Sequence, residues 1–356
     1  MSFTQIQVIS FDFQFALDII LNMSRKKQLG PDCRSDCKAS EIIEAVPKAC
    51  QDETAAVEFF EARRWGDTPC CPHCGDINVY KMTDRDGTRN KRFLWRCRGC
   101  AQQYTVRIGT VYEESRLDLR HWASGFWRMA TSKKGVAALE IKRHCQITYK
   151  AALFMLNRIR FAMAPDAATM PKLAGTVEVD EVWLGGKPRK GNDINRRKGK
   201  TDKTPVFVAV ERGGNIRRHV VADVTGRTLK AEMKRIIDRN ARIMSDEHGG
   251  YKGVEKIFAG GHFTTQHSAD EFARGDVHSN TAESSNALVK RGLVGIYHNV
   301  SKEYLHRYLW QWDFVWNHRE STDGERLARL ISASDGKRLM YTEARTRQWW
   351  KPDAWC

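Results

Sequence analysis

The sequence predicts an α/β protein built from several modules in series. Three observations lead to this class: two Cys-x2-Cys pairs within 71–100, a proline-free run with helical spacing of apolar residues over 119–163, and alternating apolar and acidic residues from 176 onwards. The 356 residues exceed one ordinary domain, which holds about 100–200 residues. Hydrophobic residues make up 41% and aromatic residues 10% of the chain, which supports a sizeable core and excludes wholesale disorder.

The charge balance points to a polyanionic partner. Lys and Arg number 59 against 43 Asp and Glu, for a net charge of +16, and such an excess repels itself unless a partner neutralises it. Nucleic acid is the first expectation, and a basic surface that only solubilises the protein is the alternative. The most apolar stretch, 4–22, is interrupted by Asp12 and Asp18 and has no basic residues ahead of it. It predicts neither a membrane span nor a signal peptide, so we expect a cytoplasmic protein without membrane contact.

Four cysteines have the spacing of a structural zinc site. Cys71 and Cys74 form one pair, Cys97 and Cys100 form a second, and 22 residues separate the pairs. Two tight turns of this kind aim four thiolates at one tetrahedral ion. Cys70 could replace Cys71 only with a longer spacing, and four free core thiols are the alternative to a metal site.

The residues between the two cysteine pairs predict a ribbon. Two short strand candidates, 79–81 and 92–96, flank a polar turn at 84–90. Without an export signal, a disulfide framework is not expected. We therefore interpret the remaining cysteines as free thiols: Cys33, Cys37, Cys50, Cys145 and Cys356.

Three helices are expected over 119–163. Ser132–Gly135 separates the first from the second, and 145–148 separates the second from a third that covers about 149–163. Two short helices around a tight turn, the later one carrying Arg158 and Arg160, predict a helix-turn-helix-like module that contacts DNA. An ordinary three-helix packing module would show the same periodicity, with its basic residues merely solvated.

A strand rich in acidic residues follows at 176–183. One of its faces would carry Glu178 and Asp180, and the other would carry Glu181. After Gly185 and Gly186 comes a basic stretch, 187–203, with eight Lys or Arg. We expect it to form a loop along DNA phosphates, and its proposed contacts are Lys187, Arg189, Lys190, Arg196, Arg197 and Lys198.

The rest of this region alternates between strands and helices. Strands at 205–211 and 216–224 form a hairpin, so three antiparallel strands are expected. A helix at 228–240 and a short strand at 241–245 follow, and that strand ends on Asp246 before a Gly-rich turn. Asn280 would cap a helix that carries Glu283 in a capping-box position and Lys290 two turns further on. Residues 301–319 predict another helix, whose aromatic stripe is expected in the core.

These motifs, taken together, resemble one family. The run VEVDEVWLGG at 177–186, the turn at 245–247, His262, His267 and the run NTAESSNALVKRGLVGIYHNVS at 280–301 are similar to the DDE transposases of bacterial insertion sequences. The similarity is specifically to the ISXO-type subgroup with an N-terminal zinc ribbon. The resemblance covers about 59–319, with the ribbon, the helical segment and the acidic elements in the same order.

The resemblance implies a ribonuclease-H-like catalytic domain, with a mixed sheet flanked by helices. It also implies a catalytic triad that corresponds to Asp180, Asp246 and Glu283, followed by a basic residue that corresponds to Lys290. Three converging carboxylates repel one another unless cations neutralise them, and hard oxygen ligands favour two Mg²⁺ or Mn²⁺ ions. Some members of the subgroup use Asn as the third ligand, so Asn280 stays an alternative to Glu283. His262 and His267 receive no role, because a structural histidine is the commoner case.

The expected function is transposition. The enzyme would bind the terminal inverted repeats of an insertion sequence, then cleave DNA strands and transfer them to target DNA. It would act as a homodimer or larger assembly, because two ends must be brought together, and it would be nucleoid-associated when bound to DNA. The alternatives are a non-catalytic zinc-ribbon DNA-binding regulator and a ribonuclease-H-like nuclease or resolvase without strand transfer.

The expected domains follow these motifs along the chain. They are an N-terminal extension (1–58), a zinc ribbon (59–112), a helical DNA-binding module (113–165), the catalytic domain (172–320) and a C-terminal tail (321–356).

Overall fold

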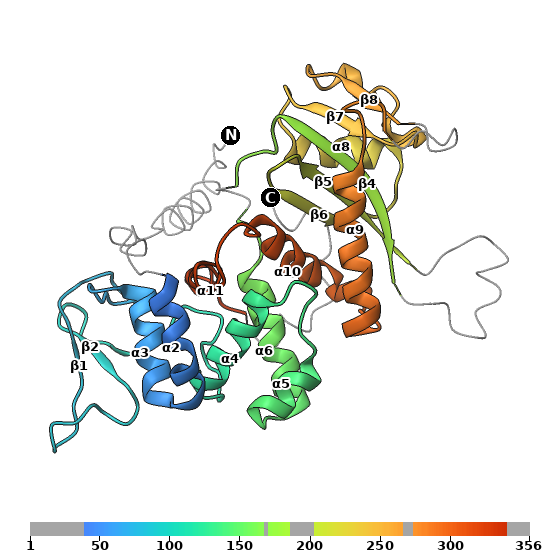
Figure 1. Cartoon of the computed structure of the whole chain (residues 1–356). Coiled ribbons are helices and arrows are strands. Elements are labelled where there is room, and N and C mark those ends of the chain that lie inside the picture. The colour runs from blue at the N-terminus through green and yellow to red at the C-terminus, as the bar shows by residue number, and fades with distance from the viewer. Residues whose placement is uncertain (1–38, 167–169, 186–202, 266–272, 340–356) are drawn as a thin grey trace, which may run out of the picture. The chain divides into compact units, whose positions relative to one another are not determined.

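The computed structural model describes residues 39–166, 170–185, 203–265 and 273–339 (Figure 1). They fall into two compact units. In the first unit the described residues are 65–105, and in the second they are the remainder. The basic stretch 187–202 and His267 lie outside the described residues.

The first unit is a small antiparallel sheet. Strands β1 (Val79–Lys81), β2 (Trp95–Cys97) and β3 (Gln103–Tyr104) pair in that order. Trp95 and Tyr104 are buried on one face, where the Trp65 ring packs edge-on against both. The expected strand at 92–96 begins only at Trp95, because Phe93 has a φ of 55° and turns the chain there. Strand β3 was not expected from the sequence.

One part of the second unit consists of helices from both ends of its sequence. They are α2 (Ala39–Gln51), α3 (Glu53–Trp65, whose last residue begins the first unit), α4 (Leu119–Thr131), α5 (Ala138–Cys145), α6 (Tyr149–Ala162) and α11 (Asp323–Ser332). The three expected helices over 119–163 are confirmed as α4, α5 and α6. The boundary expected after residue 58 falls inside α3, and the expected tail from 321 begins with α11. Both α2 and α11 pack against α4.

Local sequence explains where α5 and α6 end and begin. Gln146 ends α5 in the left-handed conformation, and the Thr148 side chain accepts a hydrogen bond from the Ala151 backbone N–H at the start of α6. The apolar face of α4 is buried, and the Phe126 ring lies 5.8 Å from that of Phe60. Leu139 of α5, although apolar, is 52% exposed.

A five-stranded mixed sheet forms the centre of the remaining region. Its strands are β4 (Thr176–Leu184), β5 (Thr204–Glu211), β6 (Ile216–Val220), β7 (Arg242–Ser245) and β8 (His262–Thr264), in the order β6-β5-β4-β7-β8. The β4–β5 and β5–β6 pairs are antiparallel, and the β4–β7 and β7–β8 pairs are parallel. The expected ribonuclease-H-like class, with a mixed sheet flanked by helices, is confirmed.

Helices cover both faces of this sheet (Figure 1). On one face, Val177 and Val179 pack in the same core as Leu229 and Met233 of α8 (Gly226–Ile236). On the other, Val182 and Leu184 of β4 pack with α9 (Asn280–Gly292) and α10 (Leu305–Asn317). Because strand residues alternate between faces, Glu178 and Asp180 lie on the α9 side.

Some element boundaries differ from the sequence expectation. Helix α8 ends at Ile236 and not near residue 240, because Ile237 turns extended and forms a parallel bridge with Leu173. Strand β6 ends at Val220. The helix expected from 301 starts as a 3-10 turn, Lys302–Tyr304, before α10 begins.

Candidate active site and zinc centre

Four cysteines of the first unit converge on one point. The Sγ atoms of Cys71, Cys74, Cys97 and Cys100 all lie within 4.8 Å of one another. Cys71 and Cys74 bracket a tight turn that is closed by a hydrogen bond from the Gly75 N–H to the Cys71 carbonyl. Four thiols in this arrangement fit a tetrahedral zinc ion.

The neighbouring Cys70 is not part of this group, which settles the choice between Cys70 and Cys71. Burial raises the pKa of the Cys71 thiol to about 12. Zinc binds the thiolate, so an ion here would displace a proton that the metal-free cluster retains.

The parallel pairing of β4 with β7 brings two of the predicted carboxylates to one edge of the sheet. Glu178 is paired with Met244, so the same register continued by two residues sets Asp180 beside Asp246. Asp246 directly follows β7, where its Oδ1 accepts a hydrogen bond from the His248 N–H at 3.1 Å. Glu283 lies in the first turn of α9.

The electrostatics of Asp180 depend on the other two carboxylates. Burial raises the pKa of Asp180 to about 6, and the charges of Asp246 and Glu283 add to the increase. The hydrogen bonds from the Glu181 N–H and the Asn286 side chain partly oppose it. A carboxyl group destabilised by like charges in this way is stabilised when a cation binds.

Asn286 is a site residue that was not expected from the sequence. Its Nδ2 donates a 2.7 Å hydrogen bond to Asp180 Oδ2, while its Oδ1 is buried and has no hydrogen-bond partner. A signal was present in the sequence, because Asn286 lies one turn after Glu283 on the same face of the helix.

Glu178 holds α9 against β4. Its side chain is completely buried, and its Oε2 accepts hydrogen bonds from the backbone N–H groups of Thr281 and Ala282 at 2.8 and 2.9 Å. Arg212 Nε donates to Oε1 at 2.7 Å. The carboxylate therefore neutralises both a cation and the positive end of the α9 helix dipole.

The expected cap of α9 was wrong. Ser279 occupies the N-cap position in place of Asn280, and its hydroxyl donates to Glu283 Oε1 at 3.1 Å. The helix N–H groups instead find their acceptor on β4, through Glu178. A long-range acceptor of this kind has no signature in the local sequence.

Two further groups of contacts lie next to Asp180 and Asp246 in the sequence. Glu181 accepts a 2.6 Å hydrogen bond from the Tyr251 hydroxyl and lies 2.9 Å from His248 Nδ1. His262 Nε2 lies 2.8 Å from Ser245 Oγ, and that hydroxyl donates to the Asp246 carbonyl. His262 is thus a hydrogen-bonded structural histidine, which is the commoner role for a histidine.

The donor chemistry of the carboxylate site fits hard divalent cations. All three groups offer carboxylate oxygens, the ligands that Mg²⁺ and Mn²⁺ prefer, and the unpartnered Asn286 oxygen adds a fourth acceptor. Among the described residues, only the cysteines group as tightly as 4.8 Å, so the three carboxylates are spread more widely. Two ions about 4 Å apart need carboxylates that are separated in this way, because the carboxylates at opposite ends of the site bind different ions.

The structure corrects part of the predicted DNA surface. Arg158 and Arg160 are only 6% and 1% exposed. Arg158 donates to the backbone carbonyls of Val111 and Glu113, and Arg160 donates to Gln311. Both were predicted to contact DNA, but α6 turns their side chains towards neighbouring elements and away from solvent. Lys290, by contrast, is exposed on α9.

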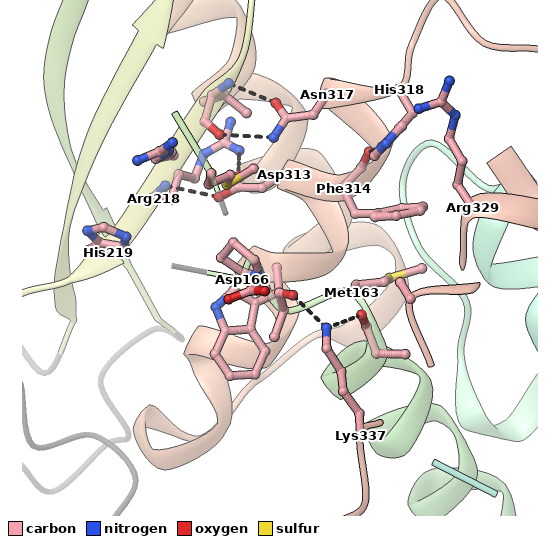
Figure 2. Close-up of a pocket in the computed structure, with 18 of the residues that line it drawn as sticks. Met163, Asp166, Arg218, His219, Asp313, Phe314, Asn317, His318, Arg329 and Lys337 are labelled. Atoms are coloured by element: carbon pink, nitrogen blue, oxygen red, sulfur yellow. Dashed lines mark hydrogen bonds and ion pairs between the residues drawn. The ribbon is translucent and has the colours of Figure 1, made fainter. Parts of the chain in front are cut away.

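A separate cavity of about 350 Å³ lies beside α10 (Figure 2), and none of the three carboxylates lines it. Arg218 of β6 pairs there with Asp313 of α10. Lys337 donates to the carbonyls of Ala162 and Ala164 at the end of α6, and burial lowers the pKa of Lys337 to about 8. These contacts join β6, α6 and α10, and none of them involves the three carboxylates.

No helix in the described parts of the chain combines the length and apolar character needed to cross a membrane.

Comparison with known proteins agrees with this architecture. Residues 172–317 match the ISXO2-like transposase domain, and residues 51–103 match the transposase zinc-ribbon domain. A protein of Halobacterium salinarum, described as an uncharacterized protein in transposable element ISH50, is 28% identical over 276 residues, which cover 74% of this chain and 90% of that protein.

The zinc ribbon and the ribonuclease-H-like domain are thus those of a mobile-element transposase. Within that class, residues 172–317 match the ISXO2-like transposase domain in particular.

Proposed function

We propose that this protein binds the terminal inverted repeats of its own insertion sequence, cleaves the DNA strands there and joins them to target DNA. The observation that carries this proposal is the environment of Asp180, whose pKa is raised to about 6 by burial and, to a lesser extent, by the charges of Asp246 and Glu283. A buried carboxylate with a raised pKa and other carboxylates beside it is typical of a cation site.

Asp180, Asp246 and Glu283 would hold two Mg²⁺ or Mn²⁺ ions, with Glu283 preferred over Asn280 because a carboxylate binds a divalent ion better than an amide does. When bound, these ions supply the activation of a water or DNA 3′-hydroxyl and the stabilisation of the leaving oxygen. Asn286 keeps Asp180 oriented, and Glu178 keeps α9 in place. Lys290, exposed two turns from Glu283, would bind a neighbouring phosphate.

DNA recognition would fall to the ribbon, the α4–α6 module and the basic stretch 187–203. Two element ends must be brought together for strand transfer, so a homodimer or larger assembly is proposed. The protein would act in the cytoplasm, at the nucleoid.

The test incubates the purified full chain with Mg²⁺ and a labelled duplex that carries the element ends. Joined products support the proposal, cleavage without joining indicates a nuclease or resolvase, and binding alone indicates a regulator. Asp246→Asn should lower the cleavage rate about 1000-fold or more, because several kcal/mol of transition-state stabilisation are lost.

Asp223→Asn is the matched control, because Asp223 is an exposed carboxylate that only accepts hydrogen bonds from Thr225 and Thr228. Equal rates for the two variants would refute the assignment of Asp246.

A further inference from the structure

Two buried arginines near the start of α10 have no acidic partner among the residues that the structure describes. Arg160 of α6 is 1% exposed and Arg307 of α10 is 2% exposed. Burial lowers the pKa of Arg307, and the charge of Arg160 lowers it further. The two positive charges are therefore close enough to interact. Within the described part of the chain, no Asp or Glu forms an ion pair with either guanidinium.

The two side chains differ in how their N–H groups are satisfied. Arg160 has neutral acceptors, of which the Gln311 side-chain oxygen is the closest at 2.9 Å, and its guanidinium lies 3.9 Å from the Tyr308 ring centroid. Arg307 Nε and Nη1 are buried and have no acceptor. The ring of Tyr304 lies over this guanidinium at 5.4 Å.

Another buried arginine of this unit shows what a structural role requires. Arg326 donates to the carbonyls of Ala130, His318 and Ser321 and pairs with Asp323. A buried charge that lacks such partners destabilises the free protein. Arg307 is therefore a cation for which the described residues supply no acceptor at Nε or Nη1.

The position of Arg307 suits a DNA ligand. Leu305 and Leu309 of α10 belong to the same core cluster as Val289 and Leu293 at the end of α9, so the start of α10 lies at the same end of α9 as the exposed Lys290.

The chain between α9 and α10 is irregular. It contains a π-helical turn, Leu293–Tyr297, and His298 with a φ of 58° and a ψ of −42°. Such irregular turns and strained residues cluster at functional sites.

We propose that Arg307 binds a backbone phosphate of the DNA substrate, with the positive charge of Arg160 behind it increasing the attraction. A guanidinium offers a planar pair of N–H donors that matches two phosphate oxygens. The half-exposed Tyr304 ring would move aside as the phosphate enters. The inference rests on the proposed DNA substrate, and it assigns one contact that neither the family comparison nor the carboxylate site implies.

The test compares the full chain with Arg307→Met and Arg307→Lys. Binding to a fluorescein-labelled duplex is measured by anisotropy without Mg²⁺, over a series of salt concentrations. Arg307→Met should weaken binding about tenfold and reduce the slope of log affinity against log salt by about 1, as expected for one lost phosphate contact. Arg307→Lys keeps the charge and should keep most of the slope.

Thermal unfolding without DNA supplies the second readout. Arg307→Met should leave the melting temperature unchanged or raise it, because it removes an uncompensated charge, whereas Arg326→Met should lower it. A salt slope unchanged by Arg307→Met would overturn the proposal, as would a melting temperature that falls as far as that of Arg326→Met. If Arg307→Met does not fold, Arg307→Gln takes its place. Its salt slope is then compared with that of Arg307→Lys, and equal slopes would overturn the proposal.

Failure of this inference is distinguishable from failure of the proposed function. The unaltered chain would still cleave DNA with Mg²⁺ if only the Arg307 contact were wrong. Absence of cleavage by the unaltered chain would instead refute the proposed function, whatever the salt slopes.

Discussion

The side-chain amide of Asn286 on α9 donates a 2.7 Å hydrogen bond to the carboxylate of Asp180 on β4. The two residues are 106 positions apart in the sequence, yet this bond fixes the orientation of one of the three proposed ligands. It links the helix that carries Glu283 to the strand that carries Asp180.

Replacing Asn286 with Ala should lower the single-turnover DNA cleavage rate about 10- to 100-fold, the usual effect of losing a residue that orients a metal ligand. Mn²⁺ affinity, measured by electron paramagnetic resonance, should fall in parallel. Ser284→Ala, an exposed change on the same helix, is the control and should leave both unchanged. An Asn286→Ala variant with normal Mn²⁺ affinity and rate would contradict this role.

Glu178→Gln should reduce the free energy of unfolding by about 3–5 kcal/mol, because it leaves Arg212 without its anionic partner and gives the start of α9 a poorer acceptor. Denaturant titration measures the loss. Glu255→Gln is the comparison: Glu255 is 53% exposed and lies 4.0 Å from His262, and such surface pairs contribute about 0–1 kcal/mol. Similar losses for the two variants would show that Glu178 does not stabilise α9.

Zinc should be required for the structure of the ribbon. Cys74→Ser should abolish the bound zinc, measured by elemental analysis, and weaken DNA binding, because structural zinc contributes folding free energy directly. Cys70→Ser should retain a full equivalent of zinc, since Cys70 is outside the four-cysteine group. Loss of zinc from Cys70→Ser together with its retention in Cys74→Ser would reverse the ligand assignment.

The stability of the α8 region should depend on acid pH through Glu232. Burial raises the pKa of Glu232, but hydrogen bonds and charges from His219 and Arg235 outweigh this effect and lower it to about 2, against an ordinary value of 4.5. A lowered carboxyl pKa stabilises the fold above the unfolded value, and this contribution disappears as the pH falls towards the folded value.

The deficit of Glu232→Gln in unfolding free energy should therefore shrink from about 3 kcal/mol at about pH 5 to about 1 kcal/mol at about pH 3. Denaturant titrations at both pH values measure it. Glu320, which is 85% exposed, provides the control variant Glu320→Gln, which should show no such trend. A deficit that is constant with pH would contradict the ion-pair explanation.

The spacing of residue types along the sequence was sufficient to predict the structural features that depend on neighbouring residues. The two Cys-x2-Cys pairs predicted the four-thiol cluster, apolar periodicity predicted α4, α5 and α6, and alternation predicted β4 and β5. The same local spacing did not predict the turn at Phe93, where the backbone conformation changes without a strong residue signal. It also did not predict the short strand β8.

By itself, the sequence determined the modules and their order, because turn chemistry, periodicity and ligand spacing operate over a few residues. The acidic residues proposed for catalysis came from the family resemblance of the motifs that carry them. Only the tertiary structure decided which charges are buried and what each of them contacts. It buried Arg158 and Arg160, assigned Glu178 to the start of α9 and brought Asn286 to Asp180. Those contacts join residues distant in the sequence, and their energies depend on burial and direction, which no local pattern encodes.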